Sequence, residues 1–140
     1  MTELELKERK NEIFNNWTSM TQRDIDLDNL MKQAHEELAV GDGITINLWS
    51  DSHAYTVIKR TPSTITVQRD RAILDPNFKP QWILGGFVGH CVNQEDQTYT
   101  YERNENGEVL TLRFSKKHGR FMYLDRAVSI GRREFYDYNF

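Results

Sequence analysis

The stretch 53-HAYTVIKRTPSTITVQRD-70 decides the fold class, because it predicts a β-hairpin. Its two halves, His53–Arg60 and Thr64–Asp70, are rich in Thr, Val, Ile and Tyr, the residues that favour β-strands. Thr61-Pro62-Ser63 separates the halves and supplies residues typical of a turn. The pattern therefore predicts antiparallel pairing at this point of the chain.

Further extended segments are predicted on both sides of this hairpin, at Ile44–Trp49, Thr98–Arg103, Glu108–Phe114, Arg120–Leu124 and Arg133–Tyr138. Asn104–Gly107 stands between the second and third of these, and Asn-Gly supplies the positive φ that a tight hairpin turn needs. We therefore expect Thr98–Arg103 to pair with Glu108–Phe114. A turn at Lys117-His118-Gly119 is expected to lead into the next strand.

Residues 1–40 show helical periodicity instead, and neither Pro nor Gly interrupts them. A first apolar stripe comprises Leu6, Ile13, Phe14 and Trp17. A second helix is predicted to begin near Asp26 or Asp28, whose carboxylates suit an N-cap, and to end at Gly41 in the left-handed conformation. The apolar face of that helix comprises Leu27, Leu30, Met31, Ala34 and Leu38. The sequence therefore predicts a single α+β domain over residues 1–140, with an N-terminal helical segment (1–40) and a β-rich, antiparallel core (41–140).

The composition argues against several classes of protein. The chain has 140 residues, about one domain, with 21 acidic and 18 basic side chains and a net charge of −3. This balance disfavours strong binding to duplex nucleic acid, which needs a basic surface. We expect no membrane segment and no signal peptide, because no apolar run approaches the ~20 residues of a membrane span and the N-terminus is highly charged. The single cysteine, Cys91, excludes an internal disulfide and is typical of a reducing compartment.

The patterns expected of an enzyme are weak. Cys91 follows His90, but sequence neighbours rarely form a Cys–His dyad, and a lone cysteine more often behaves as a small buried hydrophobe. The histidines at positions 35, 53, 90 and 118 show no metal-ligand spacing. The glycine-containing segments 41–43 and 85–89 lack the Lys-Ser/Thr pair of a phosphate-binding loop. We therefore expect no catalytic residue, no metal and no cofactor.

Two features favour ligand binding. Residues 71–97 contain Pro and Gly with little periodicity, yet they also carry several large apolar side chains, so they are expected either to pack across the sheet or to wall a ligand pocket or subunit contact. The C-terminal half interleaves aromatic residues with arginines. Aromatic rings can stack on bases and guanidinium groups can hold phosphates, although the same composition also fits ordinary strands with solvated arginines. Together with the acidic balance, the pattern favours a small phosphate-bearing ligand over long DNA.

The run 49-WSDSHAYTVI-58 begins an ordered set of motifs that resembles a family of small phage and prophage proteins. The set continues with 67-VQRD-70 and Ala72, 79-KPQWILGGF-87 with His90, Cys91 and Asn93, 99-YTYE-102 with Gly107, Arg113 before Gly119-Arg120, and 131-GRREFYDY-138. The resemblance covers about residues 40–140 and leaves out the N-terminal helices. The functional family that the chain resembles is the phage Thoeris anti-defence sponges, which bind a cyclic ADP-ribose immune signal without cleaving it.

The resemblance implies a phage counter-defence protein that acts in the host bacterial cytoplasm. It implies recessed pockets at the interface of a homodimer or higher homo-oligomer, with a small cyclic nucleotide as ligand. By order along the chain, Trp82 or Phe87 matches the aromatic residue that faces adenine, and Asn93 matches the amide at its edge. Arg113 and Arg133 match the two arginines that hold the phosphates. Arg120 and Arg132 are alternatives for that role.

Two further expectations concern partners. The helix that carries Ile13, Phe14 and Trp17 is expected to pack on the sheet of a second subunit, because an apolar stripe beside a thin core favours self-association. The alternative function is a protein-binding inhibitor of a host defence nuclease, similar to an anti-CRISPR protein, that docks through residues 71–97. A nucleotide hydrolase lacks an evident base and metal set in this sequence.

Overall fold

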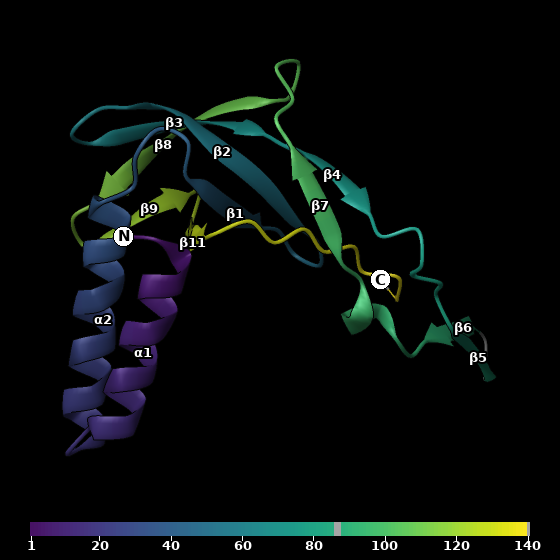
Figure 1. The fold of residues 1–140 in the computed structure, drawn as a ribbon, viewed down its shortest axis with the longest axis horizontal. Coiled ribbons are helices and arrows are strands. Elements are labelled where there is room, and N and C mark those ends of the chain that lie inside the picture. Colours follow the sequence, from purple (N-terminus) through teal and green to yellow (C-terminus); the bar gives the residue numbers. More distant parts are fainter. Residues whose placement is uncertain (86–87, 140) are drawn as a thin grey trace.

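A computed structural model describes residues 1–85 and 88–139 (Figure 1). Two N-terminal helices, α1 (Glu3–Asn16) and α2 (Met20–Glu36), precede a set of antiparallel strands, which confirms the α+β class. The strands are β1 (Gly43–Asn47), β2 (Ser52–Arg60), β3 (Thr64–Arg69), β4 (Arg71–Leu74), β5 (Trp82–Gly85), β6 (Val88–Cys91), β7 (Tyr99–Glu102), β8 (Val109–Ser115), β9 (Arg120–Tyr123), β10 (Arg126–Ala127) and β11 (Ser129–Ile130), with a 3-10 turn, η1 (Gln94–Asp96). In the part of the chain described, neither helix is long and apolar enough to cross a membrane.

Seven strands form one sheet in the order β10-β9-β8-β3-β2-β1-β11. Only Val128 separates β10 from β11, so the two edges of the sheet meet at this residue and the sheet closes on itself as a small barrel. The predicted hairpin of His53–Arg60 and Thr64–Asp70 is confirmed as β2 and β3, with Val57 opposite Val67. The barrel interior is filled by Ile44, Ile46, Tyr55, Val57, Ile65, Val67, Leu112, Phe121 and Val128.

Helix α2 closes one end of this barrel. Leu38, just beyond the helix, joins the barrel core, and the Phe121 backbone N–H donates a 3.0 Å hydrogen bond to His35 Nδ1. Phe121 is fully buried and its ring stacks on the His35 ring at 6.3 Å between centroids. Arg120 forms a 3.0 Å ion pair with Asp28, which ties β9 to the outer side of the helix. The opposite end of the barrel has no helix over it among the described residues.

Stability is expected to fall as the pH drops from about 6.5 to about 4, because of His35. Burial, and secondarily the charge of Arg120, lowers the pKa of His35 from 6.5 to about 4. Over that interval the unfolded chain takes up a proton that the folded chain refuses, so protons favour unfolding. The free energy of unfolding should decrease by about 3 kcal/mol at most, measured by urea denaturation at pH 7 and at pH 4.5. The H35Q variant should lose most of this pH dependence and the H118Q variant should retain it; equal slopes in all three proteins would contradict the assignment.

The second predicted hairpin is wrong in its pairing. Strand β7 pairs with β4 and strand β8 pairs with β3, so Thr98–Arg103 does not pair with Glu108–Phe114. Strands β3 and β4 run outward and β7 and β8 return beside them as one long ribbon, and Asn104–Gly107 is a loop within the returning half. Gly107 has no positive φ. A Cβ at this position would instead collide with the Arg69 backbone carbonyl, so glycine is needed for close approach.

Replacing Gly107 with alanine should therefore lower the free energy of unfolding by about 2 kcal/mol, because the strand backbone must shift to admit the methyl group. A matched control is Gly89→Ala in β6, where an added Cβ would make ordinary contacts at 3.5 Å or more. Thermal denaturation of the two variants measures the difference. Equal melting temperatures would show that the ribbon tolerates a side chain at residue 107.

The helices differ from the sequence prediction at their boundaries. Helix α2 begins at Met20, where Ser19 is the N-cap and its Oγ accepts the Gln22 N–H at 3.1 Å, so neither Asp26 nor Asp28 caps it. The helix ends at Glu36, before Gly41. Gly41 does adopt the predicted left-handed conformation, with φ +97°, within the connection to β1.

Residues 71–97 do not pack across the sheet, which was one of the two expectations for them, and they contain regular strands. They belong to an arm, residues 71–102, that leaves the barrel at β3 and returns at β8 (Figure 1). Strands β4 and β7 form its base and the β5–β6 hairpin forms its tip. The arm and the helical hairpin extend from different sides of the barrel, so the molecule has the shape of an arch (Figure 1).

A C-terminal strap, residues 132–139, ties the arm to the barrel. Within the described residues it pairs with the sheet only through an isolated bridge between Phe135 and Ser52, so the extended segment expected over Arg133–Tyr138 does not form a full strand. Each backbone N–H group of the strap donates one hydrogen bond. The acceptor is a side-chain oxygen in every case except Phe135, whose N–H donates to a backbone carbonyl. The acceptors, in order from residue 132, are Glu3, Thr45, Tyr101, Ser52, Gln97, Asp51, Gln94 and Asp137. The Asn139 side chain adds a bond to both N and O of Cys91.

Candidate functional site

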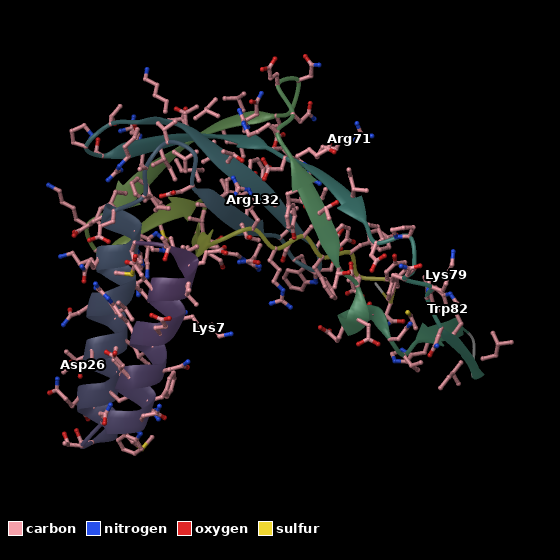
Figure 2. All side chains as sticks on the ribbon, in the orientation of Figure 1. Lys7, Asp26, Arg71, Lys79, Trp82 and Arg132 are labelled. Carbon is pink, nitrogen blue, oxygen red and sulfur yellow. The ribbon has the colours of Figure 1, made fainter. Side chains whose placement is uncertain are left out.

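Trp82 and Asn93 are two of the residues predicted to bind ligand. Trp82 lies in the tip of the arm (Figure 2), and Asn93 lies beside it, bonded to Gln81. Trp82 is half exposed and meets the Tyr138 ring edge-on at 6.4 Å between centroids. Asn93 Oδ1 accepts the Gln81 N–H at 2.7 Å, and its Nδ2 donates to the Lys79 carbonyl at 2.8 Å. The Asn93 amide thus already has a partner at both ends, which fixes its orientation within the tip.

Arg113 lies elsewhere, on the outer face of β8 near the closed end of the barrel. It lines a shallow hollow of about 570 Å³ together with Ser115, His118, Met122 and Leu124, among others. Ser115 Oγ and His118 Nδ1 are 2.9 Å apart in this hollow, but the same Oγ also accepts the His118 backbone N–H, as expected of a turn-forming serine. This pair therefore stabilises the β8–β9 turn.

Arg133 lies on the strap, where its backbone N–H donates to Thr45 Oγ1 and its side chain is exposed. A single copy therefore brings Trp82 and Asn93 together, but it does not bring Arg113 to either of them, because Arg113 is at the closed end and the arm leaves from the other end. Phe87, the alternative aromatic residue, lies outside the described residues. Arg120 and Arg132, the alternative arginines, are both engaged in ion pairs.

Sequence reasoning missed a hollow of about 410 Å³ at the open end of the barrel. We call it the open mouth; it is lined by Ile46, Leu48, His53, Tyr55, Arg69, Glu108 and Tyr123. The register of the barrel assembles it: Tyr55 lies opposite Arg69 across β2 and β3, and the Arg69 N–H bonds to the Glu108 carbonyl at 2.8 Å. Mouths of β-barrels are a common location of small-molecule sites.

Glu134 of the strap organises one wall of the open mouth. Its Oε2 lies 2.9 Å from His53 Nδ1 and 3.0 Å from Arg69 Nη2, and its Oε1 accepts the Ala54 N–H at 3.0 Å. Burial by itself would raise the pKa of Glu134, but the bonds from His53 and Ala54 and the charge of Arg69 outweigh it and lower that pKa. Glu134 is therefore a charged anchor that holds the imidazole and the guanidinium in fixed positions.

The other wall carries a tyrosine and a second glutamate. Tyr55 OH donates a 2.9 Å hydrogen bond to Glu108 Oε1, and burial together with this bond raises the pKa of Tyr55 to about 12. The phenol thus keeps its proton at any physiological pH. Arg69 Nη1 is buried and has no hydrogen-bond partner among the described residues. A buried donor without an acceptor is costly, so an ordered water or a small movement of the side chain is expected to satisfy this atom.

The chemistry available in the open mouth suits binding. No group of three or more His, Cys, Asp or Glu side chains that could hold a metal ion occurs in residues 1–85 and 88–139. Cys91 is buried in the arm, where its Sγ donates to Asn93 Oδ1 at 3.4 Å.

The chain matches no family model, and no curated protein or solved structure is significantly similar to it.

Proposed function

We propose that this chain binds a cyclic ADP-ribose type of immune signal and sequesters it without cleaving it, as a phage counter-defence protein in the host bacterial cytoplasm. The ordered motifs from Trp49 to Tyr138 and their resemblance to the Thoeris anti-defence sponges support the proposal. A sponge acts by mass action, so it must hold the signal more tightly than the receptor does. Nanomolar affinity corresponds to about −12 kcal/mol, which requires several charge-assisted contacts in a pre-organised pocket.

The observation that carries the proposal is the state of two arginines. Across the described chain, the guanidinium groups of Arg113 and Arg133 form no ion pair and no hydrogen bond. The arginines that serve the fold are engaged instead: Arg69 with Glu134, Arg120 with Asp28, and Arg132 with Asp70. Arg113 and Arg133 are therefore free to grip phosphate oxygens at little cost to the fold.

The site requires two copies of the chain, on this proposal. Trp82 and Asn93 lie on the arm, and Arg113 lies at the far end of the barrel, so the arm of one protomer must meet the barrel of its partner. The arm presents apolar side chains for such a contact, since Ile83 is 59% and Leu84 87% exposed. Exposed apolar clusters of this kind mark interaction sites. A homodimer is the smallest assembly that completes the pocket.

The second subunit expected beneath helix α1 is part of the same proposal. Ile13 packs within its own chain, beside the small cluster of Leu6, Leu30 and Ala34. Phe14 and Trp17 are about half exposed at the far end of the helical hairpin, where the Arg23 guanidinium lies 5.8 Å from the Phe14 ring and 5.2 Å from the Trp17 ring. These two rings, and not Ile13, are the side chains available to a partner.

The test is calorimetric titration with cyclic ADP-ribose isomers, followed by chromatography of the recovered ligand. We expect one isomer to bind and to be recovered intact. The R113A and R133A variants should each weaken binding at least tenfold, since each loses charge-assisted hydrogen bonds to phosphate. The R71A variant is the matched control. Arg71 is an exposed arginine of the arm (Figure 2), and its replacement should leave ligand affinity unchanged.

Three outcomes would count against the proposal: no heat with any isomer, hydrolysed ligand, or R113A and R133A proteins that bind as well as R71A. The exposed tip of the arm favours a second candidate, a protein that blocks a host defence nuclease through residues 71–97. A double variant, I83S/L84S, separates the two. If the protein blocks a nuclease through the arm, the double variant should no longer capture the nuclease. If the protein is a sponge, the double variant should dissociate into monomers, which light scattering measures.

A further inference from the structure

We propose that the open mouth of the barrel is a second binding site, which takes a nucleobase. The proposal is independent of the sponge function, because none of Trp82, Asn93, Arg113 or Arg133 lines this hollow. The two hollows lie on opposite faces of the barrel wall: Tyr123 lines the open mouth, whereas its neighbour Met122, which pairs with Arg113 across β8 and β9, lines the outer hollow.

The walls of the open mouth suit a flat heteroaromatic ring. Tyr123 contributes a half-buried aromatic ring, Tyr55 contributes the 4% of its surface that remains exposed, and Leu48 contributes aliphatic surface beside the buried Ile46. Bases stack on aromatic faces whatever their identity, because every base has a π-face. The volume of about 410 Å³ leaves room for a ring system that enters from the solvent side, with its sugar left outside.

The polar groups of the open mouth match the edge of a base. Arg69 and Glu108 are neighbours across β3 and β8, joined through their backbones, yet the Arg69 side chain pairs with Glu134 and not with Glu108. Arg69 Nη1 is a buried donor without an acceptor. Glu108 Oε1 already accepts the Tyr55 hydroxyl, which leaves Oε2 as an acceptor. Adjacent donor and acceptor positions complement a base, whose hydrogen-bonding edge carries an acceptor beside an N–H donor.

The charge balance of the open mouth disfavours anionic ligands. Glu134 neutralises Arg69, and Glu108 adds a negative charge at the rim, so a phosphate or carboxylate placed in the open mouth would meet net repulsion. A neutral ring with its own donor and acceptor satisfies both side chains without bringing a charge out of water.

The experiment titrates adenosine, guanosine, cytidine and uridine separately into the full chain and follows amide and aromatic resonances by NMR. At least one nucleoside should bind and shift resonances of Tyr55 and Tyr123. The E108Q variant should weaken that binding about tenfold, because the amide keeps an oxygen for the Tyr55 hydroxyl but places a second donor where the base also donates. The E105Q variant is the control, since it makes the same change three residues away in the Asn104–Gly107 loop.

The experiment tests the open-mouth proposal independently of the sponge proposal. Loss of nucleoside binding in E108Q, with cyclic ADP-ribose binding unchanged, supports a second site in the open mouth. The proposal is overturned if no nucleoside shifts any resonance, if E108Q binds as well as E105Q, or if R113A abolishes nucleoside binding, which would place the base in the other site. None of these results depends on whether the sponge function holds.

Discussion

Replacing Arg132 with alanine should lower the free energy of unfolding by about 4 kcal/mol, because the change leaves a buried carboxylate unpaired. Asp70 lies at the point where β3 passes into the arm, and its side chain is only 1% exposed. Arg132 Nε donates to Asp70 Oδ2 at 2.8 Å, and Arg132 Nη2 donates to Thr56 Oγ1 at 2.9 Å. Figure 2 shows Arg132 at the centre of the arch, between barrel and arm. Its loss removes both the charge partner of Asp70 and an anchor of the strap.

The neighbouring residue supplies a matched control. Arg133 has the same side chain one position along the strap, but its guanidinium forms no ion pair or hydrogen bond within the described chain. The R133A variant should therefore unfold within about 0.5 kcal/mol of the parent protein. Urea denaturation followed by circular dichroism measures both variants. Equal midpoints for R132A and R133A would mean that the Asp70 pair does not stabilise the junction.

The F121A variant should also lose about 4 kcal/mol, because it opens a cavity where α2 closes the barrel. Phe121 is fully buried, packs edge-on against Phe114 at 5.2 Å, stacks on His35, and lies under the Arg60 guanidinium at 4.8 Å. Little around it can collapse into the space, since the barrel backbone is held by hydrogen bonds on both sides. Removal of this ring thus weakens the barrel core and its joint with the helix together.

Chemical denaturation checks this prediction, with L124A as the control. Leu124 lies just after the same strand, β9, but is 83% exposed, so its truncation should change stability by less than about 0.5 kcal/mol. Hydrogen exchange adds a local readout: amides of α2 near His35 should exchange faster in F121A than in the parent. A stability loss for F121A no greater than that for L124A would contradict the packing described for the barrel end.

Local sequence signals predicted the parts of the fold that depend on local pairing. The β2–β3 hairpin has its turn, alternation and strand residues in one continuous stretch, and its pairing was right. The segments that became β7 and β8 have equally strong strand signals, but their partners, β4 and β3, come before them in the chain, across the arm. Strand propensity predicts that a segment is extended, but it does not predict which other strand that segment pairs with. The Asn-Gly pair predicts a hairpin turn, but glycine is needed at residue 107 for another reason: a Cβ there would collide with the Arg69 carbonyl oxygen.

The candidate sites were predictable to a smaller extent. Trp82 and Asn93 are close together in sequence and also in the fold, but the resemblance alone linked them to Arg113 and Arg133. The open mouth was missed, since its polar groups meet only when the barrel closes. One signal was present: alternation along β3 points Val67 and Arg69 to the same interior face, and an arginine at an inward position is unusual.

The strap also determines the point in synthesis at which the fold can be completed. Residues 132–139 are made after every element that they hold, and their partners include Glu3, 129 positions away from Arg132. Contacts between such distant positions carry a large loop-closure entropy and slow the rate of folding. During synthesis the base of the arm therefore stays untied until the strap has been made, whereas Ile83 and Leu84 at its tip are exposed even in the complete fold. We expect docking of the strap to be a late step of folding.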